Sequence, residues 1–222
     1  MSIERKHFTC LIAVGAVVWA ILLFLDGVPV SGALIRPFSS AVTAVVIAWK
    51  LFDKWMWRWR VFRWWFVSIP DIQGTWKGTL ASNWQRSGEA IRDQQVFFTV
   101  KQSYSSIRAQ LFTAESASQT LVAAIAQEGE AFVLSSIYRN IPRILQRGSK
   151  SPMHFGAVRF ELAGNPPYSM IGEYWTDRDT KGELVFEERT STVAHNYSEA
   201  LQLQYARIDR KTPLIEKVSE LI

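Results

Sequence analysis

Alternation of apolar and polar residues from residue 72 to residue 190 is the feature that most restricts the folds open to this chain. Eight segments carry this period of two, and short links rich in turn residues separate them. The segments are 72–82, 91–102, 105–113, 118–127, 131–139, 153–163, 168–177 and 182–190. Short links predict an antiparallel, mostly up-and-down meander, and closure into a barrel removes both exposed edges. The sequence therefore predicts a lipocalin- or streptavidin-like eight-stranded β-barrel, whose interior is either packed or holds one small ligand.

Two segments depart from the alternation. Segment 139–152 is basic and contains proline and glycine, so it predicts a longer loop. Segment 199–208 alternates like a strand, yet Asn196 precedes Glu199 by the spacing of a helix capping box. We therefore expect a short helical C-terminal tail, with a second helix start at Thr212.

Two apolar runs precede the alternating region. Residues 8–25 carry no charge and, at about 18 residues, are long enough to cross the hydrocarbon of a bilayer as a helix. A short break follows, and residues 30–52 form a second run with Arg36 near one end. The pattern predicts two transmembrane helices joined by a tight turn. A cleaved signal peptide and a buried helical hairpin of a soluble protein are the alternatives.

Residues 53–66 interleave indole rings with positive charge. The residues are Trp55, Trp57, Arg58, Trp59, Arg60, Arg63, Trp64 and Trp65. This mixture is typical of a membrane–water interface, where rings lie at the headgroups and arginines face phosphate. The alternative is stacking of single-stranded nucleic acid. Basic residues flank the two outer ends of the apolar runs, so the positive-inside rule predicts a multi-pass membrane protein with both termini cytoplasmic.

Composition argues against several classes of function. The net charge of +5 belongs partly to residues 53–66, so it is weak support for a nucleic-acid polymer as partner, and we expect none. Cys10 is the single cysteine, which precludes a disulfide framework within the chain. The three histidines, His7, His154 and His195, have no metal-ligand spacing, and no nucleophile or nucleotide motif is present. We therefore expect no metal, no catalytic residue and no enzymatic activity.

Residues 171–184 contain the strongest candidates for ligand contact. In an alternating strand, Tyr174, Thr176 and Arg178 share one face, where an ordinary barrel core would have aliphatic residues. A phenol, a hydroxyl and a guanidinium could together stack a base and hold a phosphate. The alternative is that residues 178–182 are simply a charged hairpin turn.

Other candidates come from elsewhere in the barrel. Trp76 lies in a Gly-x-Trp motif near the first strand, where it either packs in the core or stacks on a ligand. Alternation also allows Tyr138 to face inward together with Phe132, Leu134 and Ser136. Arg108 is a further candidate to face a ligand, although a sequence alone does not fix its direction.

The whole arrangement resembles a known family. PDIQGTWKGTL at residues 70–80 and GEYWTDRDTKGEL at residues 172–184, after two apolar runs and an aromatic–basic segment, resemble the two-helix β-barrel effectors of bacterial CBASS anti-phage systems. The resemblance implies that a partner CD-NTase, a nucleotidyltransferase that responds to phage, makes a cyclic dinucleotide that the barrel binds. Binding then promotes self-association, and the membrane helices disrupt the inner membrane and kill the cell. Carried onto this sequence, it implies ligand contacts from Tyr174, Thr176, Arg178 and Thr180.

These expectations define three regions and three functions. The regions are a membrane part at 1–66, a cytoplasmic ligand-sensing barrel at 67–195 and a C-terminal tail at 196–222. The first function is the effector, whose partners are a cyclic dinucleotide, other copies of itself and the lipid bilayer, with no other cofactor. The alternatives are a membrane-tethered structural or protein-binding barrel and a lipocalin-like carrier of an apolar ligand.

Overall fold

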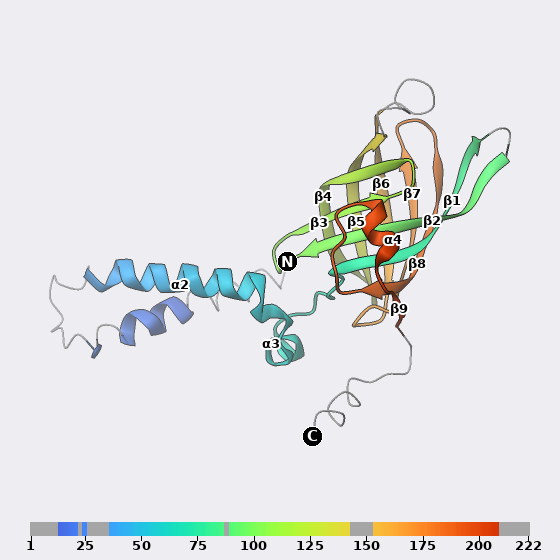
Figure 1. The fold of residues 1–222 in the computed structure, drawn as a ribbon. Coiled ribbons are helices and arrows are strands. Elements are labelled where there is room, and N and C mark those ends of the chain that lie inside the picture. Colours follow the sequence, from blue (N-terminus) through green and yellow to red (C-terminus); the bar gives the residue numbers. More distant parts are fainter. Residues whose placement is uncertain (1–12, 22–23, 26–35, 87–88, 143–152, 209–222) are drawn as a thin grey trace. The chain divides into compact units, whose positions relative to one another are not determined.

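A computed structural model describes residues 13–21, 24–25, 36–86, 89–142 and 153–208 (Figure 1). The chain divides into two compact units, Met1–Val67 and Ser68–Ile222. Each unit is described by itself.

The N-terminal unit is helical. Residues 13–21 are helical, and α2 (Arg36–Lys54), the 3-10 turn η2 (Met56–Arg58) and α3 (Arg60–Trp65) follow. The ring of Phe52 packs edge-on against Phe62 and Phe66, with ring centroids 5.3 and 5.6 Å apart. These aromatic contacts fold the chain after α2 back onto the end of that helix.

The predicted transmembrane helices are wrong. Among the described residues, no helix is long and apolar enough to cross a membrane. The helix described in the first run covers residues 13–21, and the rest of that run is described only at 24–25. In the second run, α2 starts at Arg36 and its sequence includes three further charged residues, Lys50, Asp53 and Lys54. The expected multi-pass placement in the inner membrane depended on these two helices, so it is not supported either.

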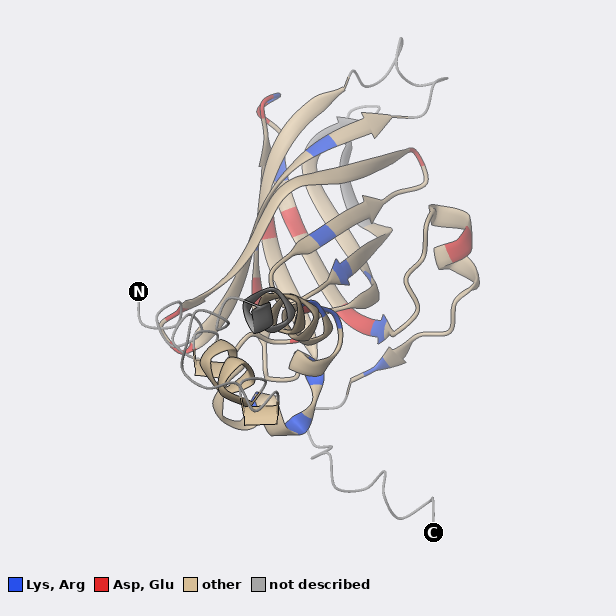
Figure 2. Cartoon of the chain, turned by 90° about the vertical axis from the view of Figure 1, so that its left-hand side faces the viewer, with Lys and Arg blue, Asp and Glu red and all other residues tan. Residues whose placement is uncertain are grey.

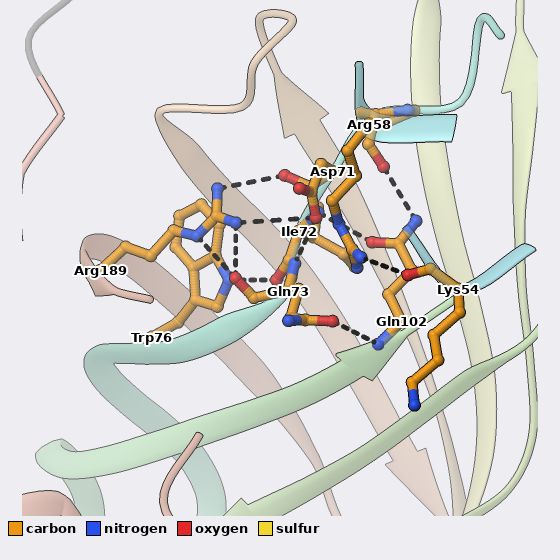
Figure 3. Close-up of polar contacts among 9 residues, drawn as sticks. Lys54, Arg58, Asp71, Ile72, Gln73, Trp76, Gln102 and Arg189 are labelled. Atoms are coloured by element: carbon orange, nitrogen blue, oxygen red, sulfur yellow. Dashed lines mark hydrogen bonds and ion pairs between the residues drawn. The ribbon is translucent and has the colours of Figure 1, made fainter. Parts of the chain in front are cut away.

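The aromatic–basic segment forms two short helical turns. Trp57 is fully buried, and the guanidinium of Arg58 lies 4.5 Å from its ring centroid. Arg58 also donates to the carbonyl oxygen of Lys54, which satisfies one of the last carbonyls of α2 (Figure 3). Trp55, Trp59, Arg60, Trp64 and Trp65 are exposed, whereas Arg63 is half-buried. An interfacial role for these side chains stays a prediction.

The second unit is the predicted β-barrel. Its strands are β1 (Gly74–Arg86), β2 (Glu89–Gln102), β3 (Ile107–Phe112), β4 (Ser116–Glu128), β5 (Ala131–Pro142), β6 (His154–Ala163), β7 (Ser169–Thr176) and β8 (Lys181–Thr190). Each strand pairs antiparallel with the next, and β8 pairs antiparallel with β1 to close the barrel. The meander and its closure confirm the barrel prediction. The loop predicted at 139–152 begins later, because β5 continues to Pro142, and residues 143–152 lie outside the described residues.

Large rings fill the barrel interior, and glycines on neighbouring strands make room for them. Phe98, Phe160 and Phe186 pack together, with ring centroids 5.1 to 5.8 Å apart. Gly172 is the register partner of Phe160, and Gly78 is the register partner of Phe186. A Cβ atom at Gly78 would lie 2.6 Å from the ring of Phe186, and one at Gly172 would overlap the ring of Phe160. The core therefore depends on which glycine faces which ring.

The entry to β1 closes one end of the barrel (Figure 3). Trp76 is fully buried, and its indole nitrogen donates to the carbonyl oxygen of Ile72 at 2.9 Å. The side chain of Gln102 accepts from the backbone N–H of Ile72 and donates to Pro70. Arg189 lies 5.0 Å from the ring centroid of Trp76 and also donates to backbone carbonyls of segment 71–73. We call this end the closed end.

The tail packs on the outside of β2 and β3. It contains α4 (Tyr197–Gln202) and β9 (Ala206–Arg207), which pairs with β8. Asn196 accepts from the backbone N–H of Glu199, and the Glu199 carboxylate accepts from the backbone N–H of His195. This capping arrangement confirms the short helix predicted from Asn196 and Glu199, whereas the helix start at Thr212 lies outside the described residues. Phe97 packs edge-on against the ring of Tyr197 and stacks with the ring of Tyr205.

Replacement of Arg189 by lysine should loosen the closed end. Lysine keeps the charge but lacks the planar guanidinium, whose several N–H groups donate to the carbonyls of Asp71 and Gln73 at the same time. We expect Arg189→Lys to lower the free energy of unfolding in urea by about 1–3 kcal/mol. The control is Arg207→Lys, because Arg207 forms an exposed ion pair with Glu187 and should cost less than about 1 kcal/mol. Equal losses in the two variants would contradict this role of Arg189.

Alkaline pH should weaken the attachment of the tail. Burial, and then the nearby Glu188 carboxylate, raise the pKa of Tyr205 from its usual 10 to about 12. The folded state therefore holds the phenol proton more tightly than the unfolded state, and this stabilisation is complete below pH 10. It is lost as the pH rises from 10 to about 12. The melting temperature of Tyr205→Phe should fall less steeply over this range than that of the wild type, and parallel curves would refute the assignment.

Candidate ligand-binding site

Hydroxyl groups line the inner face at the end of the barrel opposite the closed end. We call this the rim end, and the rim cluster is Ser82, Ser136, Tyr138, Tyr174 and Thr176. The register places Ser82, Gly182, Tyr174, Val158 and Ser136 in one row across β1, β8, β7, β6 and β5. Tyr138, Gly156 and Thr176 form the next row. Three separated parts of the sequence thus meet at this end.

Strand alternation directs the β7 members of the cluster inward. Along β7, Met170 and Gly172 are buried, whereas Ile171 and Trp175 are exposed. Tyr174 and Thr176 continue the buried face of Met170 and Gly172, as the sequence alternation predicted.

Tyr174 is held between a glycine and a serine. A Cβ atom at Gly182 would lie 2.7 Å from the Tyr174 ring, so glycine is required for the ring to lie against β8. The Tyr174 hydroxyl donates to the Ser82 hydroxyl at 2.6 Å. Burial raises the pKa of Tyr174, and the hydrogen bond with Ser82 partly offsets this. The phenol is therefore protonated and fixed in direction at neutral pH.

Tyr138 has the same kind of neighbour but a different hydroxyl environment. A Cβ atom at Gly156 would lie 2.5 Å from the Tyr138 hydroxyl oxygen. Burial, then the neighbouring Tyr174, then Asp177 raise the pKa of Tyr138, so its hydroxyl carries a proton at neutral pH. Within the part of the chain that the structure describes, this hydroxyl has no hydrogen-bond partner. It is a half-buried donor that a ligand oxygen or nitrogen can satisfy.

The turn between β7 and β8 carries the remaining candidates. The backbone N–H of Thr176 donates to Thr180, and their two side-chain oxygens are 2.6 Å apart. The backbone N–H of Arg178 donates to the Thr176 hydroxyl, and Asp179 adopts a left-handed φ of 56°. Asn83 on β1 accepts from the backbone N–H of Lys181 at 2.8 Å and so anchors the turn. Residues 176–181 are thus a hairpin turn, and it lies at the rim end.

The structure separates the other two candidates from this cluster. Trp76 lies at the closed end, buried in the core, with its indole N–H already bonded to Ile72. Arg108 is exposed on β3, on the face opposite the core residue Ala109. Neither side chain lines the rim end.

Sequence reasoning missed part of the cluster. Ser82 was not considered, because a serine at the end of an alternating segment carries no signal of its own. Gly156 and Gly182 were missed for a different reason, since their role depends on the aromatic residue directly across the strand pair. The Gly–aromatic pairing becomes visible only when the register is known.

The chemistry available at the rim end is recognition. Phenol rings, hydroxyl donors and the backbone of a tight turn can hold aromatic and polar parts of a ligand. The turn contains Arg178 and Lys181 together with Asp177 and Asp179, so its net charge is close to neutral. Figure 2 likewise shows both signs of charge on the barrel strands. Among the described residues, no three His, Cys, Asp or Glu side chains are grouped to hold a metal ion.

Comparison with known proteins adds one match. Residues 67–188, more than half of the chain, match the family described as Cap15, cyclic dinucleotide receptor domain. The match spans the entry to β1 and nearly all of the barrel, including the whole rim cluster. A search of curated proteins found no match.

Replacement of Tyr174 by phenylalanine tests the internal support of the cluster. The variant keeps the ring against Gly182 but removes the donor to the Ser82 hydroxyl. We expect a loss of about 0.5–1.5 kcal/mol in the free energy of unfolding. The control is Trp175→Phe on the same strand, because Trp175 is exposed and has no phenol group. It should change the free energy of unfolding by less than about 0.5 kcal/mol. A Tyr174→Phe variant as stable as the wild type would show that this hydrogen bond contributes nothing.

Proposed function

We propose that this chain, which belongs to the Cap15 family, binds its ligand at the rim end of the barrel. Membership of the family makes the barrel a cyclic dinucleotide receptor domain and the chain a CBASS effector. The proposal concerns the place of binding, the residues that make it and the consequence of binding.

The free Tyr138 hydroxyl is the observation that carries the proposal. A cyclic dinucleotide presents two flat bases, each with polar edges and an aromatic face. Tyr138 and Tyr174 offer phenol faces at neighbouring positions, and base–aromatic stacking is worth about 1–3 kcal/mol per base. The protonated Tyr138 hydroxyl can donate to a base edge without breaking any bond that the described residues make. A ligand there gains a hydrogen bond at little cost to the protein.

The two phosphates need positive charge and donors. Arg178 lies in the turn beside the cluster, where its backbone N–H donates to the Thr176 hydroxyl, and its guanidinium can contact phosphate oxygens with two parallel hydrogen bonds. Hydroxyls of Thr176 and Thr180 can re-orient from each other toward the ligand, because either can be the donor in their present contact. Since Asp177 and Asp179 balance the local charge, directional hydrogen bonds rather than a basic surface would select the ligand.

The consequences of binding complete the proposal. A partner nucleotidyltransferase supplies the cyclic dinucleotide, and binding favours self-association of the chain. A ligand drives association only when it binds the associated state more tightly than the single chain. The membrane-disruption step expected from two transmembrane helices is not part of this proposal, because those helices are not found among the described residues.

The carrier alternative has little support. The barrel interior from the closed end to Val158 and Leu134 is occupied by a packed core that includes Phe98 and Phe160. An apolar carrier needs that volume empty. A barrel whose interior is filled and whose rim is polar favours a ligand held at one end.

Replacement of Arg178 by alanine tests the phosphate contact. Loss of a hydrogen-bonded charge costs about 1.5–3 kcal/mol, so Arg178→Ala should weaken binding by at least about tenfold. The measurement is calorimetric titration of the full chain with cyclic di-AMP, cyclic di-GMP, cyclic di-UMP, cyclic GMP–AMP and cyclic UMP–AMP. Arg108→Ala is the matched control, because Arg108 is exposed on the outer face of β3.

Three results would contradict the proposal. Unchanged affinity in Arg178→Ala would remove the turn from the binding site. An equal loss in Arg108→Ala would indicate that binding depends on overall charge instead of on the rim end. Binding of none of the five nucleotides would favour the structural or protein-binding alternative.

A further inference from the structure

One edge of β4 is open. β3 pairs with β4 at Ala117, Ser118 and Gln119, and β5 pairs with the opposite edge of β4 as far as Glu128. From Thr120 to Glu128, no other described strand pairs with the β3-facing edge of β4. An irregularity in the pairing with β5 occurs between Thr120 and Val122, at the point where β4 leaves β3. The backbone groups along this edge are therefore available to another strand.

Exposed apolar side chains continue from this edge across the outer face of the barrel. Leu121 and Val122 are 50% and 63% exposed. The register joins Val122 to Ile137, then Ala157, then Trp175, on β5, β6 and β7. Ile137 and Trp175 are each 52% exposed. An apolar row thus runs alongside an open strand edge.

The open edge lacks the usual protection. Proteins guard free edges with charged residues or proline, because an unguarded edge pairs with other chains. The sequence TLVAAIAQ at residues 120–127 contains neither. The β3-facing edge of β2 also has no described partner strand over residues 89–96, but its sequence includes Glu89, Arg92 and Asp93. Among the described strands, the β4 edge therefore differs from this β2 edge, because it carries no charge from Thr120 to Gln127.

We propose that the edge of β4 from Thr120 to Glu128 binds the same edge of a second copy of this chain. Antiparallel pairing about a two-fold axis at Ala124 places each Val122 opposite Ala126 of the other copy, so a larger side chain meets a smaller one. Glu128 then faces Thr120, so no like charges oppose each other. This self-complementarity favours a second copy over an unrelated strand.

The same edge adjoins the ligand site, so this inference rests on the proposed function for its regulation. Thr120, where the edge begins, is the direct register partner of Tyr138. A ligand that fixes Tyr138 also fixes the backbone of its partner Thr120, at the irregularity where β4 leaves β3. When the backbone at Thr120 is ordered, the strand edge that follows it loses less conformational entropy on pairing. Nucleotide binding is thereby coupled to self-association.

The test introduces charge on the edge. Val122→Lys combined with Ala126→Lys places lysines opposite each other twice in the pair and should weaken self-association by about tenfold or more. The control is Ile171→Lys, because Ile171 is 57% exposed on β7, a strand paired on both sides. Sedimentation velocity of the full chain over a concentration series, with and without each of the five cyclic dinucleotides, measures association. Calorimetry measures nucleotide binding separately.

Loss of association in the lysine pair, with association kept in Ile171→Lys, supports the edge. Association of the lysine pair equal to the wild type overturns it, and so does a wild type that stays monomeric under every condition. Hydrogen exchange of the wild type is an independent check, because amides between Thr120 and Glu128 should slow on association. Absence of that protection also overturns the proposal. Failure of nucleotide binding alone, with edge-dependent association intact, refutes the proposed function but not the interface.

Discussion

Pairing of inward-facing aromatic rings with glycines is the constraint on which the barrel depends. Phe186 faces Gly78, Phe160 faces Gly172, and the same relation joins Tyr174 to Gly182 and Tyr138 to Gly156. A side chain on any of these glycines would meet a ring or a carbonyl of the neighbouring strand. Cores are packed as densely as crystals, so each of these four rings fits because its partner on a neighbouring strand has no side chain.

These four pairs also divide the interior by chemistry. The two phenylalanine pairs belong to the packed core, whereas the two tyrosine pairs lie at the rim end, where Ser82 and Ser136 replace aliphatic residues. The same pairing of a glycine with an aromatic ring therefore occurs in the packed core and at the polar rim end. The glycines position the tyrosine rings in the absence of a ligand, so the proposed site is largely formed before a ligand arrives, and such preorganisation lowers the cost of binding.

The helical region shows how a hydropathy pattern can mislead. The apolar run from residue 30 to residue 52 looked long enough to span a bilayer, yet the described helix starts at Arg36 and ends beyond Lys50 and Asp53. Apolar length in the sequence does not equal apolar length in a helix, because the helix boundaries decide which charges are included. The aromatic–basic segment shows a similar effect, since Trp57 is buried although its neighbours Trp55 and Trp59 are exposed.

The sequence by itself determined the barrel, because alternation and turn residues are local features that can be identified without knowing which strands contact each other. It also determined that Tyr174 and Thr176 share the inner face, and that Asn196 starts a helix, since both follow from spacing along one element. The tertiary structure decided that Trp76 belongs to the closed end, that Arg108 faces outward and that Ser82 meets Tyr174. It also left the edge of β4 beyond Gln119 without a partner among the described strands. These outcomes depend on register between strands far apart in sequence, and a slip of one residue would reverse the face of every side chain.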